Sequence, residues 1–139
     1  MNSLADLNGT EWHGTGELWL DPFGDEASRS PCSLQIEGNT VRYQWVHNDT
    51  PQQGVIELGP SMATFVDTFH SQQTMECRPL ADAPGIFQVQ GTYGAPPELW
   101  SWRIGLFYRS PLAQLVLQMT NIAPWGEETR AVRMTCQRK

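Results

Sequence analysis

The feature of this sequence that most constrains its fold is a strict alternation of apolar and polar side chains over short segments. Val41, Tyr43 and Trp45 alternate with polar residues, and the ranges 98–108 and 130–138 repeat the pattern. Successive side chains of a β-strand point to opposite faces, whereas a helix repeats after about 3.6 residues. The alternation therefore predicts strands that bury one face and expose the other, and it argues against helix in these segments.

Turn-forming residues divide the rest of the chain into similar short runs. Gly38 and Asn39 lie between two clean alternating runs, which is the strongest hairpin signal in the sequence. Turn signals recur about every 8–12 residues, a spacing typical of all-β barrels and sandwiches. We therefore expect one all-β domain over residues 1–139 with about 8–10 strands. Residues 3–9 are expected to form a single N-terminal helical turn.

Two all-β architectures fit these runs. We favour a closed antiparallel up-and-down barrel, because the runs are joined by short turns and a meander of hairpins closes most simply into a barrel. Closure also removes the exposed strand edges of an open sheet. A sandwich is the alternative, and it usually needs longer Greek-key connections.

Charge and hydropathy limit the partners of this chain. Its net charge is −6, its pI is about 4.9 and its basic residues are mostly dispersed, so it presents no basic face for nucleic acid. The first residues lack the basic start and apolar run of a signal peptide. No segment approaches the roughly 18 apolar residues of a membrane-spanning helix. We therefore expect a soluble protein with no nucleic-acid partner and no membrane span.

The three cysteines, Cys32, Cys77 and Cys136, are odd in number and widely spaced. This arrangement suits neither a disulfide framework nor a zinc site, so we expect buried free thiols and no bound metal. Free thiols persist in reducing compartments, which indicates the cytoplasm.

The N-terminal segment resembles a known family. Residues 8–17 read Asn-Gly-Thr-Glu-Trp-His-Gly-Thr-Gly-Glu and follow the expected helical turn. This resembles the opening of the calycin barrels (lipocalins, fatty-acid-binding proteins and nitrobindins), and is closest to bacterial members of the superfamily with no assigned activity. The resemblance implies that Trp12 closes the barrel floor and that an Arg or Lys of the last strand packs across it. Arg138 shares strand parity with Met134, so we expect Arg138 over Trp12.

The resemblance also bears on cofactors. Nitrobindins ligate haem through a histidine near the C-terminus, but the histidines here are His13, His47 and His70. The segment from residue 130 onward contains none, so we expect no haem and no other cofactor.

Large side chains on the expected inward face suggest a ligand. Pockets for small molecules are lined by aromatic and apolar groups with a few polar atoms, so the leading hypothesis is a small apolar or amphipathic ligand inside the barrel. A core simply filled by these side chains is the alternative. Arg130 shares parity with inward residues and could anchor a carboxylate from inside, or lie at the mouth in water. The candidate ligand-binding residues are Tyr43, Trp45, His47, Trp100, Trp102, Met119, Arg130 and Met134.

Two other functions stay open from the sequence. One is a small isomerase or hydrolase that uses His47 or His70 as its general base. Asp67 lies three residues before His70, and Cys77 follows nearby, but a buried structural thiol is the better interpretation of Cys77. The other is a structural or partner-binding domain, with a homodimer as one form. No catalytic motif is present, so we assign no catalytic residue.

Overall fold

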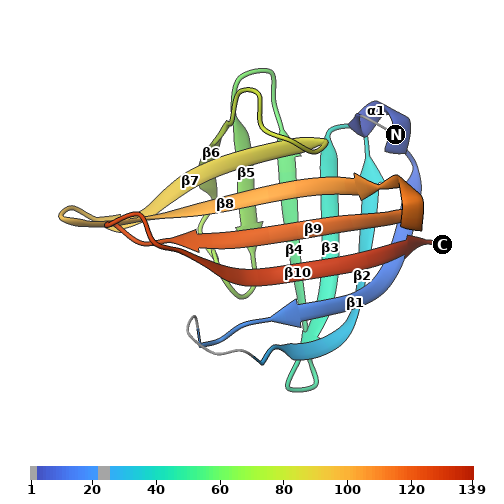
Figure 1. Cartoon of the computed structure of the whole chain (residues 1–139), viewed down its shortest axis with the longest axis horizontal. Helices are drawn as coiled ribbons and strands as arrows, with labels where there is room; N and C mark the ends of the chain where they lie inside the picture. Colours follow the sequence, from blue (N-terminus) through green and yellow to red (C-terminus); the bar gives the residue numbers. More distant parts are fainter. Residues whose placement is uncertain (1–2, 22–25) are drawn as a thin grey trace.

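The alternating segments form ten β-strands in the computed structural model, which describes residues 3–21 and 26–139 (Figure 1). Consecutive strands pair antiparallel, and β1 pairs again with β10, so the sheet closes on itself. The predicted all-β up-and-down barrel is therefore confirmed. The strands are β1 (Thr10–Leu18), β2 (Ser28–Glu37), β3 (Thr40–His47), β4 (Thr50–Leu58), β5 (Ala63–Asp67), β6 (Met75–Pro79), β7 (Phe87–Ala95), β8 (Glu98–Arg109), β9 (Gln114–Ile122) and β10 (Glu128–Arg138).

One helical turn precedes the barrel, as predicted. Helix α1 (Leu4–Leu7) begins after Ser3, whose side chain accepts a hydrogen bond from the Asp6 N–H at 3.4 Å. Such N-caps satisfy a free N–H group of the first turn. The buried side chains of α1 are Leu4 and Leu7, so the turn covers one end of the barrel, where both chain termini lie (Figure 1). A 3-10 turn, η1 (Ser110–Leu112), joins β8 to β9. No helix of the described ranges is long and apolar enough to cross a membrane.

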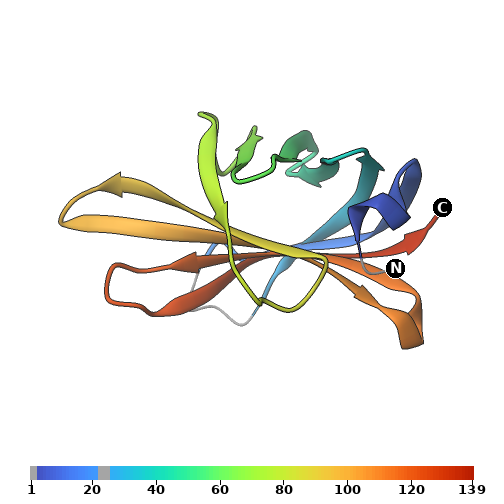
Figure 2. The ribbon, with the colours of Figure 1, turned by 90° about the horizontal axis from the view of Figure 1, so that it is seen from above.

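Most of the interior is packed with side chains. Strands β3–β5 and β7–β10 lie on opposite sides of the barrel (Figure 2), and their inward residues meet between them. Tyr43, Phe65 and Leu117 are almost fully buried. The space of about 10 Å³ beside Trp45 and Met134 is too small for an organic ligand. The deep interior is therefore a core, and space for a ligand has to be sought at an end.

Trp12 lies at the floor of the barrel, the end covered by α1. Its indole N–H donates to Thr10 Oγ1 at 2.8 Å, and the Thr10 hydroxyl donates to the Leu7 carbonyl at 2.6 Å. Arg138 is the direct cross-strand partner of Trp12, as the parity argument predicts. The Trp12 indole instead packs against the ring of Tyr108, edge-on and with the ring centroids 6.3 Å apart. The Arg138 side chain is exposed.

The cation–π contacts found in the described part of the chain lie at the other end. Arg130 and Arg133 stand over the Trp19 ring, with their guanidinium carbons 4.6 and 5.9 Å from its centroid. The expected guanidinium–indole contact therefore forms on Trp19 and not on Trp12. The backbone N–H of Trp19 donates to the Ala131 carbonyl and so extends the β1–β10 pairing past Leu18. This pairing holds Trp19 beside the two arginines of β10.

A β-bulge changes which side chains of strand β10 point into the barrel. The register with β9 shifts between Arg130 and Val132, so Ala131 is an extra residue. An extra residue reverses the parity of the side chains before it. Arg130 is consequently exposed at the mouth while Val132 and Met134 are buried. Of the two positions open to Arg130 from the sequence, the structure gives the one at the mouth.

Two hairpins project beyond the body of the barrel (Figure 1). One is β7–β8, in which Tyr93 pairs with Trp100 and their rings stack at 6.5 Å. Trp125 lies in the β9–β10 turn and is 71% exposed. Its ring packs edge-on against the ring of Trp100, with the ring centroids 5.7 Å apart. Trp100 therefore keeps the strand parity of Trp102 but lies past the rim, where its side chain does not enter the core.

Candidate functional site

The mouth of the barrel, opposite Trp12, holds a pocket of about 380 Å³. This volume is within the roughly 300–1,000 Å³ range of small-molecule sites. Its walls come from the end of β1, the β5–β6 loop, strands β7 to β9 and the bulge of β10. The residues that line this mouth pocket are Leu18, Trp19, Leu20, Phe65, Phe69, His70, Ser71, Met75, Tyr93, Trp102, Asn121, Thr129, Arg130 and Ala131.

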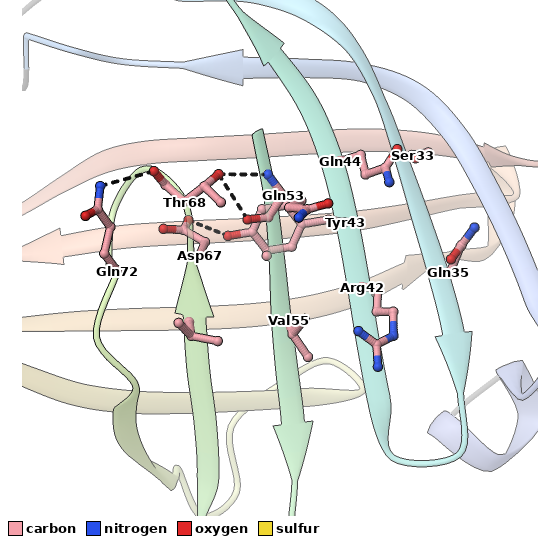
Figure 3. A pocket seen from close by; sticks show the side chains of 12 residues that line it. Ser33, Gln35, Arg42, Tyr43, Gln44, Gln53, Val55, Asp67, Thr68 and Gln72 are labelled. Carbon is pink, nitrogen blue, oxygen red and sulfur yellow. Dashed lines mark hydrogen bonds between the residues drawn. The ribbon is translucent and has the colours of Figure 1, made fainter. Parts of the chain in front are cut away.

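A larger hollow of about 500 Å³ lies over the outer face of β2–β5 (Figure 3). Its walls are exposed polar side chains such as Arg42, Gln44 and Gln53. Val55 and Val66 also line this outer hollow, together with the buried Tyr43 and Asp67. The mouth pocket differs in its aromatic wall of buried Phe65 and Trp102, whose rings stack 6.5 Å apart.

Asp67 organises the chemistry of the mouth. It follows the inward residue Phe65 by two positions, so strand parity turns its carboxylate inward at the end of β5, where it is buried. The Tyr43 hydroxyl donates to Oδ2 at 2.5 Å, and Figure 3 shows the Tyr43 ring pointing toward this carboxylate. The backbone N–H groups of Phe69, His70 and Ser71 all donate to Oδ1. Asp67 therefore fixes the shape of the loop that carries His70.

The Asp67 side chain also binds the imidazole of His70, with Oδ2 3.1 Å from Nδ1. A carboxylate is only an acceptor, so the proton of neutral His70 lies on Nδ1 and its Nε2 carries a lone pair. The imidazole lies among three aromatic rings. Its centroid is 5.0 Å from that of Trp102, 6.2 Å from that of Trp45 and 4.8 Å from that of Phe69. This side chain lines the mouth pocket, which gives the pocket one oriented acceptor nitrogen.

The electrostatics of Asp67 favour its charged form. Burial alone raises the pKa of this carboxyl group, but hydrogen bonds from His70, Tyr43 and the Ser71 N–H outweigh burial and lower the pKa. Burial and the adjacent Asp67 charge raise the pKa of Tyr43 well above its usual value, so this phenol stays a donor. The set is thus a charged carboxylate between a neutral phenol and an imidazole.

Two indole N–H groups in the lining lack partners. The Nε1 atoms of Trp19 and Trp102 are buried and make no hydrogen bond in the described part of the chain. Buried donors are normally satisfied, so each such exception needs an explanation. Both residues line the mouth pocket, and a ligand atom or ordered water that accepts a hydrogen bond there would satisfy them.

The structure distributes the eight sequence-predicted ligand residues over several places. Trp102 and Arg130 line the mouth pocket. Tyr43 and Trp45 support it from behind, through Asp67 and His70. Met119 and Met134 are core residues, His47 packs on Trp45 and Phe69, and Trp100 lies past the rim. The structure thus does not gather Tyr43, Trp45, Trp100 and Trp102 around one cavity.

Asp67 and His70 lie three positions apart in the sequence, which makes His70 a candidate general base but places neither residue among the predicted ligand-binding residues. Their spacing was the available signal, because an Asp that ends a strand commonly hydrogen-bonds the backbone just after it. The partner of this pair, Tyr43, lies 24 positions away, and only strand register brings it near. Phe69 and Asn121 in the walls gave no local signal at all.

These observations define a class of protein: a closed ten-stranded antiparallel barrel with a packed core and an aromatic pocket at its mouth. This architecture is compatible with a calycin-like fold. No protein-family model matches the chain, and no curated protein is similar to it in sequence at a significant level.

Proposed function

We propose that this protein binds a small apolar or amphipathic molecule in the mouth pocket, as a calycin-like barrel whose ligand sits at the rim above a filled core. The observation that carries the proposal is the unpartnered N–H of Trp102 in an aromatic wall of a pocket of about 380 Å³. Aromatic faces supply apolar contact, and a buried donor without a partner selects a ligand that brings an acceptor. A flat molecule with an acceptor on one edge matches both features.

The polar groups of the pocket lining restrict further which ligands can bind, through the hydrogen bonds they can make. His70 Nε2 accepts a hydrogen bond, whereas Trp19 and Trp102 donate. Asn121 and Thr129 add groups that can do either. We therefore expect a ligand with both an acceptor and a donor, separated by an apolar body.

A fluorescent probe tests this proposal directly. An anilinonaphthalene sulfonate should bind with a blue-shifted emission, and fatty acids, retinoids or tetrapyrroles should displace it. Trp102→Phe keeps the aromatic wall but removes the N–H, so the acceptor-bearing ligand should bind about two- to tenfold more weakly, the effect of one hydrogen bond. Trp100→Phe on the same strand lies past the rim and is the matched control.

Native mass spectrometry of the freshly expressed chain complements the titration. It reports any co-purified ligand and the oligomeric state together, including the homodimer left open by the sequence. If no compound of the panel displaced the probe and none co-purified, the binding proposal would fail and a structural or partner-binding role would replace it.

A second candidate function is supported by the Asp67–His70 contact. A carboxylate that orients a histidine and leaves its Nε2 lone pair free is the arrangement of a general base. Hydrolysis of a flat aryl ester is a suitable probe, because the pocket accepts an aromatic body and water can be the nucleophile. His70→Gln should reduce the rate to the solution background, whereas His47→Gln, at the end of β3, should not. Equal rates in the two variants would reject this candidate.

We also propose that the protein is located in a reducing compartment. The three cysteines are free and buried, which accords with a cytoplasmic protein whose thiols stay reduced.

A further inference from the structure

Three aromatic rings gather past the rim of the barrel, where the tips of two hairpins lie side by side (Figures 1 and 2). Tyr93 and Trp100 are cross-strand partners in the β7–β8 hairpin, and Trp125 lies in the β9–β10 turn. The Trp100 ring contacts both of the others, with centroid distances of 6.5 Å to Tyr93 and 5.7 Å to Trp125. These three residues are called the hairpin cluster below.

The ring planes of the hairpin cluster form a corner. The Tyr93 and Trp100 planes are inclined by 28°, whereas the Trp125 plane stands at 69° to that of Trp100. Two rings therefore make a floor, and the third makes a wall beside it. Trp125 is 71% exposed and Tyr93 39%, so both parts of the corner reach water. A round group that lies in the corner can contact floor and wall at once.

Hydrogen bonds within the chain hold the hairpin cluster in shape. The Tyr93 hydroxyl donates to Asn121 Oδ1 at 2.5 Å, and the Trp125 indole N–H donates to Glu127 Oε2 at 3.2 Å. Both polar groups are thus satisfied, which leaves the ring faces for a ligand. A site that is ordered before binding loses less conformational freedom when the ligand arrives.

The surroundings of the hairpin cluster favour a positive charge. The face of an aromatic ring is negative and attracts cations, most strongly in tryptophan. The Glu127 carboxylate lies at the edge of the Trp125 ring, and Glu98 is exposed at the tip of the neighbouring hairpin. Arg103, a basic residue of β8, is paired with Glu128. The whole chain carries a net charge of −6, so a cation is also attracted from a distance.

Trp19 provides an internal comparison. Its ring is covered by Arg130 and Arg133 of the same chain, whereas no cation–π contact of the described residues falls on the hairpin cluster. The ring faces of the hairpin cluster therefore remain open to a cation from outside the chain.

We propose that the hairpin cluster, together with the Glu127 carboxylate, is a binding site for a quaternary ammonium group such as that of choline. This group carries no N–H, so ring faces hold it without hydrogen-bond acceptors. A primary ammonium ion has three N–H donors, and aromatic faces do not replace the water that accepts from them. The same trimethylammonium group occurs in free choline compounds and in the headgroups of choline lipids.

Ligand-observed NMR on the full chain tests the proposal. Saturation transfer to the methyl groups of choline and of tetramethylammonium should show weak, saturable binding. An uncharged isostere, in which a tert-butyl group replaces the trimethylammonium group, should bind about two- to fivefold more weakly, the loss of an exposed cation–π attraction. Equal binding of the isostere would overturn the proposal, because apolar contact alone would then explain the signal.

Variants locate the site on the hairpin cluster. Trp125→Leu keeps an apolar side chain in the exposed turn but removes the aromatic face, so choline should bind about two- to fivefold more weakly. Trp125→Phe should retain more affinity than Trp125→Leu. Glu127→Gln should weaken binding at low salt and have less effect at high salt, because salt screens surface charges. Glu57→Gln, at an exposed position of β4, is the matched control and should change nothing. Native affinity in Trp125→Leu would overturn the proposal.

Phosphatidylcholine vesicles distinguish the two sources of the trimethylammonium group. Co-sedimentation that free choline inhibits would assign the site to lipid headgroups, and choline binding without co-sedimentation would assign it to free compounds. Co-sedimentation that choline does not inhibit and that persists in Trp125→Leu would indicate insertion into the bilayer and would overturn the proposal. The mouth pocket is tested separately, because Trp102→Phe alters that pocket but should leave choline binding unchanged.

Discussion

The Tyr43 hydroxyl donates a hydrogen bond of 2.5 Å to Asp67 Oδ2, and the tyrosine ring reaches this carboxylate by crossing the strand between them at Gly54. Gly54 pairs with Tyr43 on one side and with Asp67 on the other. The glycine leaves the space that the ring occupies, so one absent side chain connects the packed core to the loop of the mouth pocket.

Gly54→Ala should destabilise the barrel by about 1–3 kcal/mol, the usual cost of overpacking. A Cβ at this position would lie 2.2 Å from Tyr43 Cζ and 2.3 Å from its hydroxyl oxygen. Guanidinium unfolding measures the change. Gly16→Ala is the matched control, because its Cβ would lie 3.4 Å from the Cys32 Cβ. Equal losses in both variants would show that the tyrosine ring does not depend on Gly54.

Asp67→Asn should cost about 1–3 kcal/mol near neutral pH, because it weakens a buried charged acceptor. The pKa of Asp67 is lowered by folding, so its stabilisation is complete above the unfolded pKa of about 3.9 and is lost as the pH falls through the lower folded pKa. The stability gap between the native chain and the variant should therefore narrow in acid. A gap that widened in acid would contradict the prediction.

Thr10→Val should destabilise the floor by about 1–3 kcal/mol, because it leaves the buried Trp12 N–H without an acceptor and the Leu7 carbonyl without a donor. Valine keeps the shape of threonine, so packing changes little. The exposed Thr15 on the same strand supplies the control Thr15→Val. A thermal unfolding series should separate the two variants, and a neutral Thr10→Val would mean that the hydrogen-bond chain adds nothing to stability.

A double-mutant cycle on Arg130→Gln and Trp19→Leu should give a coupling of about 0.5–1 kcal/mol, the range for an exposed cation–π contact. The Arg130 guanidinium lies 4.6 Å from the Trp19 ring centroid. The same cycle on Arg138 and Trp12 should give additive losses, since the Arg138 side chain is exposed and the Tyr108 ring packs on the indole. A coupling confined to the second pair would reverse this assignment.

Local pattern was enough to predict which strands form and which faces they bury. Val41, Tyr43 and Trp45 alternate in the sequence and are buried in β3. Parity together with closure of the barrel also predicted that Arg138 pairs with Trp12. These features follow from the two-residue repeat of an extended chain, which each segment carries in itself.

The site could be predicted only in part, because its members depend on pairing between distant strands. The extra residue Ala131 reverses the parity of Arg130, so that its side chain no longer shares a face with Val132 and Met134. Only the alignment of β10 with β9 reveals this extra residue. Trp100 kept its parity, but the hairpin that carries it runs past the rim. Parity states the side of a strand, whereas depth in the barrel is set by where neighbouring strands end.

The sequence by itself determined an all-β chain, its turn positions and its inward aromatic residues, because these depend on neighbours within a few positions. Tertiary structure decided that those aromatic residues fill the core, that the pocket lies at the mouth, and that Tyr43, Asp67 and His70 meet there. It also placed the Cys32 and Cys136 sulfur atoms 3.6 Å apart. Register between strands fixes such meetings, and register is a property of the closed sheet that no single segment contains.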